Sequence, residues 1–168
     1  MLSEQELIRR EKLNKITQLG INPHPDHFDI SHDLKDAADL PDGTEGVRVA
    51  GRIVAIRKMG KLDFISIGDI EGKLQLLLKK DVVGEETFEQ FHEIIDIGDF
   101  IGVEGEMFTT KTGQKTLRIH SYKFLGKSLK PLPEKWHGIQ DVELRYRQRY
   151  LDLIVTESSQ KRFCFEAK

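Results

Sequence analysis

The sequence predicts a mainly β fold, a five-stranded Greek-key barrel with an N-terminal helix before it and a linker plus helix after it. Two observations carry this prediction. Between residues 46 and 125, three strand-like segments come before one helical pattern, and two further strand-like segments follow it. The strands also alternate between apolar and polar residues with the period of two that half-buried strands show. We therefore divide the chain into residues 1–45, 46–125 and 126–168.

The overall composition limits the kinds of protein this chain can be. Its 168 residues suffice for one core with appendages, and its net charge of −2 gives no global basic field, so any nucleic-acid binding must come from a local patch. The single cysteine, Cys164, excludes a disulfide framework. We find neither a signal peptide nor an apolar run of membrane-spanning length. We expect a cytoplasmic, soluble protein that does not bind membranes.

A helix is expected to begin at Ser3, because Ser3 and Glu6 have the spacing of a capping box. It should end near Leu19, where Gly20 can cap it and Pro23 prevents its continuation. Its basic residues either form a solvated face or provide a supplementary grip on phosphates. These residues are Arg9, Arg10, Lys12 and Lys15.

Residues 22–46 have low hydrophobicity and several prolines and acids, which indicates a surface connector. Three histidines fall here, His24, His27 and His32. Their spacings match no zinc pattern and no cysteine is near, so we expect no metal site.

The second expected strand, residues 62–67, places Ile65 and Ile67 on one face and Phe64 on the other. Asp63 shares the face of the two isoleucines, and Leu62 and Ser66 share the face of Phe64. In the third strand, an all-leucine face must point to the core, and it consists of Leu74, Leu76 and Leu78. Gln75 and Leu77 are then displayed beside Phe64.

This displayed face has the features that a splayed-out nucleobase needs, an aromatic ring, an amide and a rim of cations. The surrounding basic residues are Arg52, Arg57, Lys58 and Lys61. The alternative is that Phe64 belongs to the core and the basic residues form a solvated edge. One strand pair alone slightly favours this alternative.

The remaining elements complete the barrel. Phe88, Phe91 and Ile95 recur at helical spacing within 84–96. Residues 100–108 return to a strand, with Ile101, Val103 and Met107 on one side, and a turn at 110–113 leads into a last strand at 116–125. Three strands, a helix and two strands make the layout of an OB-fold, which binds oligonucleotides across its second and third strands. This layout favours the nucleobase interpretation of Phe64, although OB domains also bind sugars and proteins.

Beyond residue 125 the chain changes character. Residues 127–138 form a stiff, proline-containing linker, and Asp141 can begin a helix that runs to Ile154. Tyr146 and Tyr150 lie on its apolar stripe, and we expect this stripe to pack on a neighbouring domain or subunit.

Four segments closely resemble the amino-terminal part of the bacterial-type class II lysyl-tRNA synthetases. They are RVAGRIVAIRKMGKLDF, GKLQL, IGDFIGVEGEMFTTKTG and KSLKPLPEKWHGIQDVELRYRQRYLDLI. The last one separates lysyl from aspartyl and asparaginyl enzymes. The resemblance implies an anticodon-binding OB domain at 46–125 and, at 126–168, a hinge and the start of a truncated catalytic domain.

The resemblance also implies the partners and cofactors. The partner would be the anticodon loop of lysine tRNA, and the intact enzyme, a homodimer, would use ATP and Mg²⁺. None of the three class II motifs follows Phe163 in this chain, so we expect no catalytic residue, cofactor or metal ligand here and no catalysis by the chain alone.

Carried over residue by residue, the resemblance implies an aromatic stacking role for Phe64, base-edge reading for Gln75 and contact with the anticodon loop for Arg57. Leu77 stands where related enzymes often have an aromatic residue, and Gln114 and Ser66 stand where the family usually has Glu and Asp. The candidate nucleic-acid-binding residues are therefore Arg57, Lys61, Phe64, Gln75, Leu77 and Gln114.

Three functions are compatible with the sequence. The favoured one is the anticodon-binding portion of a lysine–tRNA ligase. A free-standing single-strand-binding module would bind matched and scrambled anticodon loops alike. A protein-interaction domain that uses the helical residues 145–154 would be revealed by measuring self-association.

Overall fold

The computed structural model describes residues 3–70, 72–131, 146–147, 150 and 153. The chain forms two compact units, Met1–Lys130 and Pro131–Lys168. In the second unit, Tyr146, Arg147, Tyr150 and Leu153 are helical. The other residues of the predicted linker and helix, from 132 to 154, lie outside the described residues.

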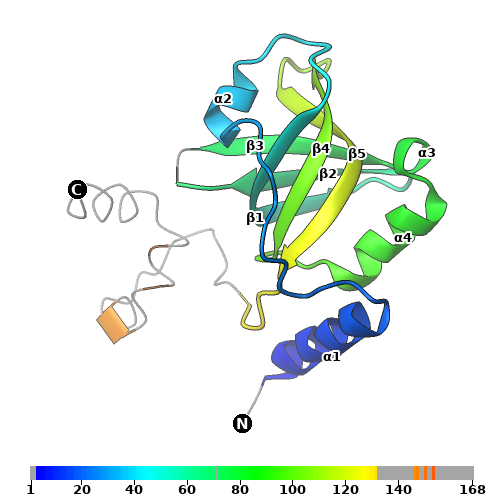
Figure 1. The fold of residues 1–168 in the computed structure, drawn as a ribbon, viewed down its shortest axis with the longest axis vertical. Coiled ribbons are helices and arrows are strands. Elements are labelled where there is room, and N and C mark those ends of the chain that lie inside the picture. The colour runs from blue at the N-terminus through cyan, green and yellow to red at the C-terminus, as the bar shows by residue number, and fades with distance from the viewer. Residues whose placement is uncertain (1–2, 71, 132–145, 148–149, 151–152, 154–168) are drawn as a thin grey trace. The chain divides into compact units, whose positions relative to one another are not determined.

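The first unit is built on a closed barrel of five strands (Figure 1). The strands are β1 (Val47–Lys58), β2 (Leu62–Gly68), β3 (Lys73–Lys79), β4 (Phe100–Thr109) and β5 (Lys115–Gly126). They are hydrogen-bonded in the order β1-β2-β3-β5-β4, and β1 also pairs with β4. All pairings are antiparallel except that of β3 with β5. This is the predicted OB-fold Greek key.

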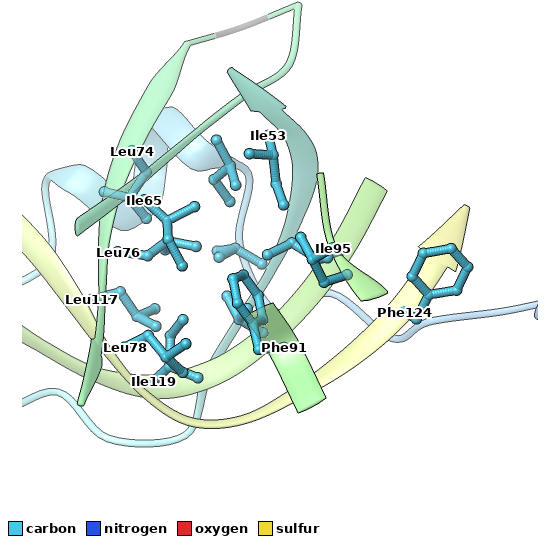
Figure 2. Packing of buried hydrophobic residues seen from close by; sticks show 14 of the residues in the cluster. Ile53, Ile65, Leu74, Leu76, Leu78, Phe91, Ile95, Leu117, Ile119 and Phe124 are labelled. Carbon is cyan, nitrogen blue, oxygen red and sulfur yellow. The ribbon is translucent and has the colours of Figure 1, made fainter. Parts of the chain in front are cut away.

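The barrel interior holds the residues that strand alternation predicted. Leu74, Leu76 and Leu78 are all buried, as are Ile65 and Ile67 on the neighbouring strand. Figure 2 shows the three leucines one above another along β3, pointing into a cluster that includes Phe91. On β4 the predicted inward residues, Ile101, Val103 and Met107, are also buried.

The helical pattern between β3 and β4 forms two short helices, α3 (Lys80–Val83) and α4 (Glu85–Ile94). Gly84 separates them with a φ of 89°, a conformation that L side chains rarely adopt. Phe88 and Phe91 of α4 enter the barrel core, as their helical spacing predicted.

The connector before β1 is more ordered than the sequence indicated. It contains a helix, α2 (Leu34–Ala38), whose Leu34 and Ala37 belong to the barrel core. Leu34 fits there because Gly51 has no side chain; a Cβ at Gly51 would lie 3.3 Å from Leu34 Cδ1. The prediction of a plain surface loop is wrong for this segment. Five residues are too few to show a helical period, so the sequence pattern could not indicate this helix.

The N-terminal helix α1 (Glu4–Gln18) begins with the predicted capping box at Ser3. Ile16 is its only buried residue, so apolar packing contributes little to its docking. Three of its basic side chains instead bind α4, the loop after it and the residues that follow β5. Lys12 Nζ lies 2.6 Å from Asp96 Oδ1, Lys15 pairs with Glu93, and Arg9 donates to the carbonyl oxygens of Ser128 and Ile97 at 2.7 and 3.0 Å. These contacts favour a structural role for these three residues over a grip on phosphates.

Lys127 is the centre of this ionic network, with a side chain only 1% exposed. Its ammonium lies 2.6 Å from both Asp96 Oδ2 and Asp99 Oδ2, and it donates to the carbonyl oxygen of Ile94 at 2.8 Å. Burial raises the pKa of both carboxyls. Lys12 and Lys127 outweigh this effect at Asp96 and lower its pKa, whereas burial prevails at Asp99 and keeps its pKa raised.

Within the described part of the chain, no helix has the length and apolarity that crossing a membrane requires.

The network predicts that Lys127→Met destabilises the barrel unit. The substitution leaves the partly buried Asp96 and the fully buried Asp99 without their shared counter-charge, which should lower the free energy of unfolding by about 3–5 kcal/mol. Urea unfolding followed by circular dichroism measures this loss. The control Lys58→Met, at an exposed position at the end of β1, should change stability by no more than about 0.5 kcal/mol. Equal stability of the two variants would contradict the assignment.

Candidate nucleic-acid interface

Two rows of side chains cross the outer face of the barrel, because residues paired across neighbouring strands point to the same side. In strand order β1-β2-β3-β5-β4, one row is Arg57, Phe64, Leu77, Arg118 and Glu106. The next row is Ala55, Ser66, Gln75, Thr116 and Phe108. A β-bulge between Ile53 and Ala55 sets the phase of β1. The barrel thus brings four of the six candidate residues into two adjacent rows.

Phe64 lies on this outer face and is half-buried. Its neighbours Asp63 and Ile65 point inward and are buried. The strand phase predicted from the sequence is therefore confirmed, and Phe64 lies outside the barrel core.

Leu77 shares the row but is only 9% exposed. The expectation that it is displayed is therefore wrong, although it lies on the predicted face. Phe64 is its partner on β2 and Arg118 is its partner on β5, and these two larger side chains flank it. Leu77 forms an apolar floor between them.

Gln75 connects the strand face to the β4–β5 loop. Its Nε2 donates to Thr116 Oγ1 at 3.2 Å, and Thr116 Oγ1 donates to the carbonyl oxygen of Gln114 at 3.2 Å. The loop itself is held by Thr110, whose Oγ1 accepts from the backbone N–H of Gln114 at 3.1 Å. Gln75 and Gln114, far apart in the sequence, thus meet through one buried hydroxyl.

The β1–β2 loop supplies the positive charge. It turns at Gly60, where φ is 79°, and the backbone N–H of Met59 donates to Leu62 O at 2.9 Å. Arg57, Lys58 and Lys61 are exposed around it, and none of them forms an ion pair with any other described residue. Their charges remain available to a ligand.

Arg52 does not belong to this rim, which corrects the sequence-based expectation. Its guanidinium lies 4.2 Å from the centre of the Phe100 ring and donates to Gly98 O at 3.1 Å. Burial lowers the pKa of Arg52, although the negative charge of Asp99 acts in the opposite direction and raises it. The bulge separates Arg52 from Arg57, and Arg52 pairs with Gly68 at the far end of β2.

Two features near Phe64 were not foreseen. Asp63 is fully buried, and its Oδ2 bonds to Nε2 of His92, whose ring lies 4.5 Å from that of Phe88. This contact ties β2 to α4 behind Phe64. One feature of the sequence could have indicated this contact. Asp63 lies on the inward face of its strand, and a buried charge needs a partner. The second feature is a cluster on β4 and β5 in which Arg118 lies over Phe108.

Comparisons with known proteins agree with the OB-fold. Residues 47–125 match the model of the tRNA anticodon type, described as an OB-fold nucleic acid binding domain. The chain is 49% identical to the lysine–tRNA ligase of Aquifex aeolicus over 135 residues, which are 80% of this chain and 23% of that protein. It is 46% identical to the Thermoanaerobacter sp. enzyme over 171 residues, 99% of this chain and 34% of that protein.

The lysine–tRNA ligase of Staphylococcus aureus strain Mu3 is 40% identical over 178 residues, covering 99% of this chain and 36% of that protein. The chain thus spans between about a quarter and a third of the length of the curated relatives it matches.

The different burial of Leu77 and Phe64 predicts different effects on stability. Leu77→Ala should lower the free energy of unfolding by about 2–5 kcal/mol because it leaves a cavity under the outer face. Phe64→Ala should cost clearly less, because the ring is half-exposed and lies outside the core. Thermal and urea unfolding of the two variants check this order. A Phe64 variant as unstable as the Leu77 variant would return Phe64 to the core.

Proposed function

We propose that the chain is the anticodon-binding portion of a bacterial lysine–tRNA ligase. Residues 47–125 match the model of an OB-fold nucleic acid binding domain, and the chain is similar over 99% of its length to bacterial lysine–tRNA ligases. One observation carries the proposal. The outward row of Arg57, Phe64 and Leu77, next to Gln75, crosses strands β2 and β3, the face that OB-folds use for oligonucleotides.

Each candidate side chain has a role that its place supports. Phe64 offers a ring on which an unstacked base of the anticodon loop stacks, with Leu77 as the apolar support of that ring. Gln75 donates one N–H to Thr116, and its amide keeps a second N–H and a carbonyl oxygen for a base edge. Gln114, whose backbone carbonyl oxygen accepts from Thr116 Oγ1, offers a second amide. Arg57 and Lys61 attract the phosphates.

The proposal places the chain in a larger reaction. In an intact ligase, lysine would be activated by ATP with Mg²⁺ and then transferred to the end of the tRNA, in a cytoplasmic homodimer. The described residues contain no group of three His, Cys, Asp or Glu side chains that could hold a metal. The part assigned to this chain is to bind the anticodon loop and orient the tRNA.

Phe64→Ala should weaken binding of an isolated lysine anticodon stem-loop by about 1–3 kcal/mol, because a stacking platform is lost. Fluorescence titration at one fixed salt concentration measures the effect, since phosphate contacts make affinity salt-dependent. Phe64→Tyr keeps the ring and serves as the matched control, with affinity close to that of the unmodified chain. Unchanged affinity in the alanine variant, with the fold intact, would refute the assignment of Phe64.

Arg57→Ala should act through charge instead. Removing one phosphate contact should make the plot of log affinity against log salt concentration shallower by roughly 0.7, the value for one phosphate of a single strand. Arg10→Ala, an exposed arginine on α1, is the control and should leave the slope unchanged. A larger change in slope for Arg10 than for Arg57 would move the phosphate contacts from the β1–β2 loop to α1.

A further inference from the structure

Three outward side chains on β4 and β5 form a cluster that none of the candidate roles includes. They are Glu106, Phe108 and Arg118. The Arg118 guanidinium carbon lies 4.8 Å from the centre of the Phe108 ring, and Nη1 donates to Glu106 Oε2 at 3.0 Å. Two partners thus fix the plane of the arginine. Its side chain is still 36% exposed, so a ligand can reach it.

The backbone is shaped to present this cluster. Glu104 pairs with Ser121 and Gly105 with Ile119, so His120 is an extra residue on β5. This bulge shifts the phase of β5 and turns Arg118 outward, opposite Glu106. Gly105 is required for the close approach of the two strands, because a Cβ there would lie 1.8 Å from the carbonyl oxygen of Arg118.

The cluster continues the candidate site. Arg118 pairs with Leu77 on β3, and Leu77 pairs with Phe64 on β2. Two strand spacings separate Arg118 from Phe64, which is about 10 Å. The floor between them is the apolar Leu77. An RNA loop that places one base on Phe64 therefore brings a neighbouring nucleotide to Arg118.

We propose that Arg118, held flat by Phe108 and Glu106, is a second stacking platform that receives another unstacked base of the same loop. The inference rests on the proposed function. Guanidinium planes stack on nucleobases as aromatic rings do.

Glu106 decides between a base and a phosphate as the ligand of Arg118. Its carboxylate neutralises the arginine at 3.0 Å and would repel a phosphate brought to the same place. A neutral base meets no such repulsion, because stacking uses the face of the guanidinium and leaves the bond to Glu106 intact.

Two substitutions separate the possible roles. If Arg118 stacks, Arg118→Ala weakens stem-loop binding by roughly 5- to 150-fold, the effect of removing a base-stacking side chain, with no change in the salt slope. Arg118→Lys does not restore affinity, because an ammonium keeps the charge but offers no plane. Lys123→Ala, an exposed cation on the same strand, is the control and binds as the unmodified chain does. Thermal unfolding confirms that each variant is folded.

A different result would overturn the inference. If Arg118→Lys binds as tightly as the unmodified chain and Arg118→Ala has a shallower salt slope, Arg118 contacts a phosphate. Unchanged affinity of a folded Arg118→Ala chain would also overturn it. If Phe64→Ala still weakens binding in that case, the proposed function stands and only the second platform is lost. If the unmodified chain fails to bind the stem-loop at all, the proposed function itself fails.

Discussion

The parallel pairing of β3 with β5 is the constraint on which the rest of the structure depends. Three register pairs form it, Gln75 with Thr116, Leu76 with Leu117, and Leu77 with Arg118. The middle pair closes the apolar interior, and the outer pairs join two halves of the outward face that lie some forty residues apart in the chain. One short contact therefore completes the core and also assembles the candidate binding surface, so both depend on the same backbone pairing.

The sequence predicted what is local. Leu74, Leu76 and Leu78 on one side and Phe64 on the other follow from the strand period alone, and Phe88 and Phe91 follow from the helix period. Contacts between residues far apart in the chain could not be predicted from the sequence. Lys127 is buried by carboxylates such as Asp99, 28 residues away, and Asp63 bonds to His92, 29 residues away.

Phase and exposure also depend on neighbours that a single strand does not reveal. Arg118 faces outward because β5 has a bulge at His120, and a bulge leaves no mark in an alternating pattern. Leu77 occupies the predicted face yet is covered, because Phe64 and Arg118 flank it. The basic residues also divide into two groups that the sequence does not distinguish. Lys12 and Lys127 serve the ionic network, whereas Arg57 and Lys61 remain exposed.

The most direct test of the central claim, that the outer face across β2, β3 and β5 binds the anticodon loop, is to map the contact by nuclear magnetic resonance. The backbone amide signals of an isotope-labelled chain would be followed while a lysine anticodon stem-loop is added. We expect the shifts to concentrate at residues 57–66, 75–77 and 114–118, with α1 and α4 little affected. Shifts concentrated on α1, with the β2–β3 face unchanged, would contradict this claim.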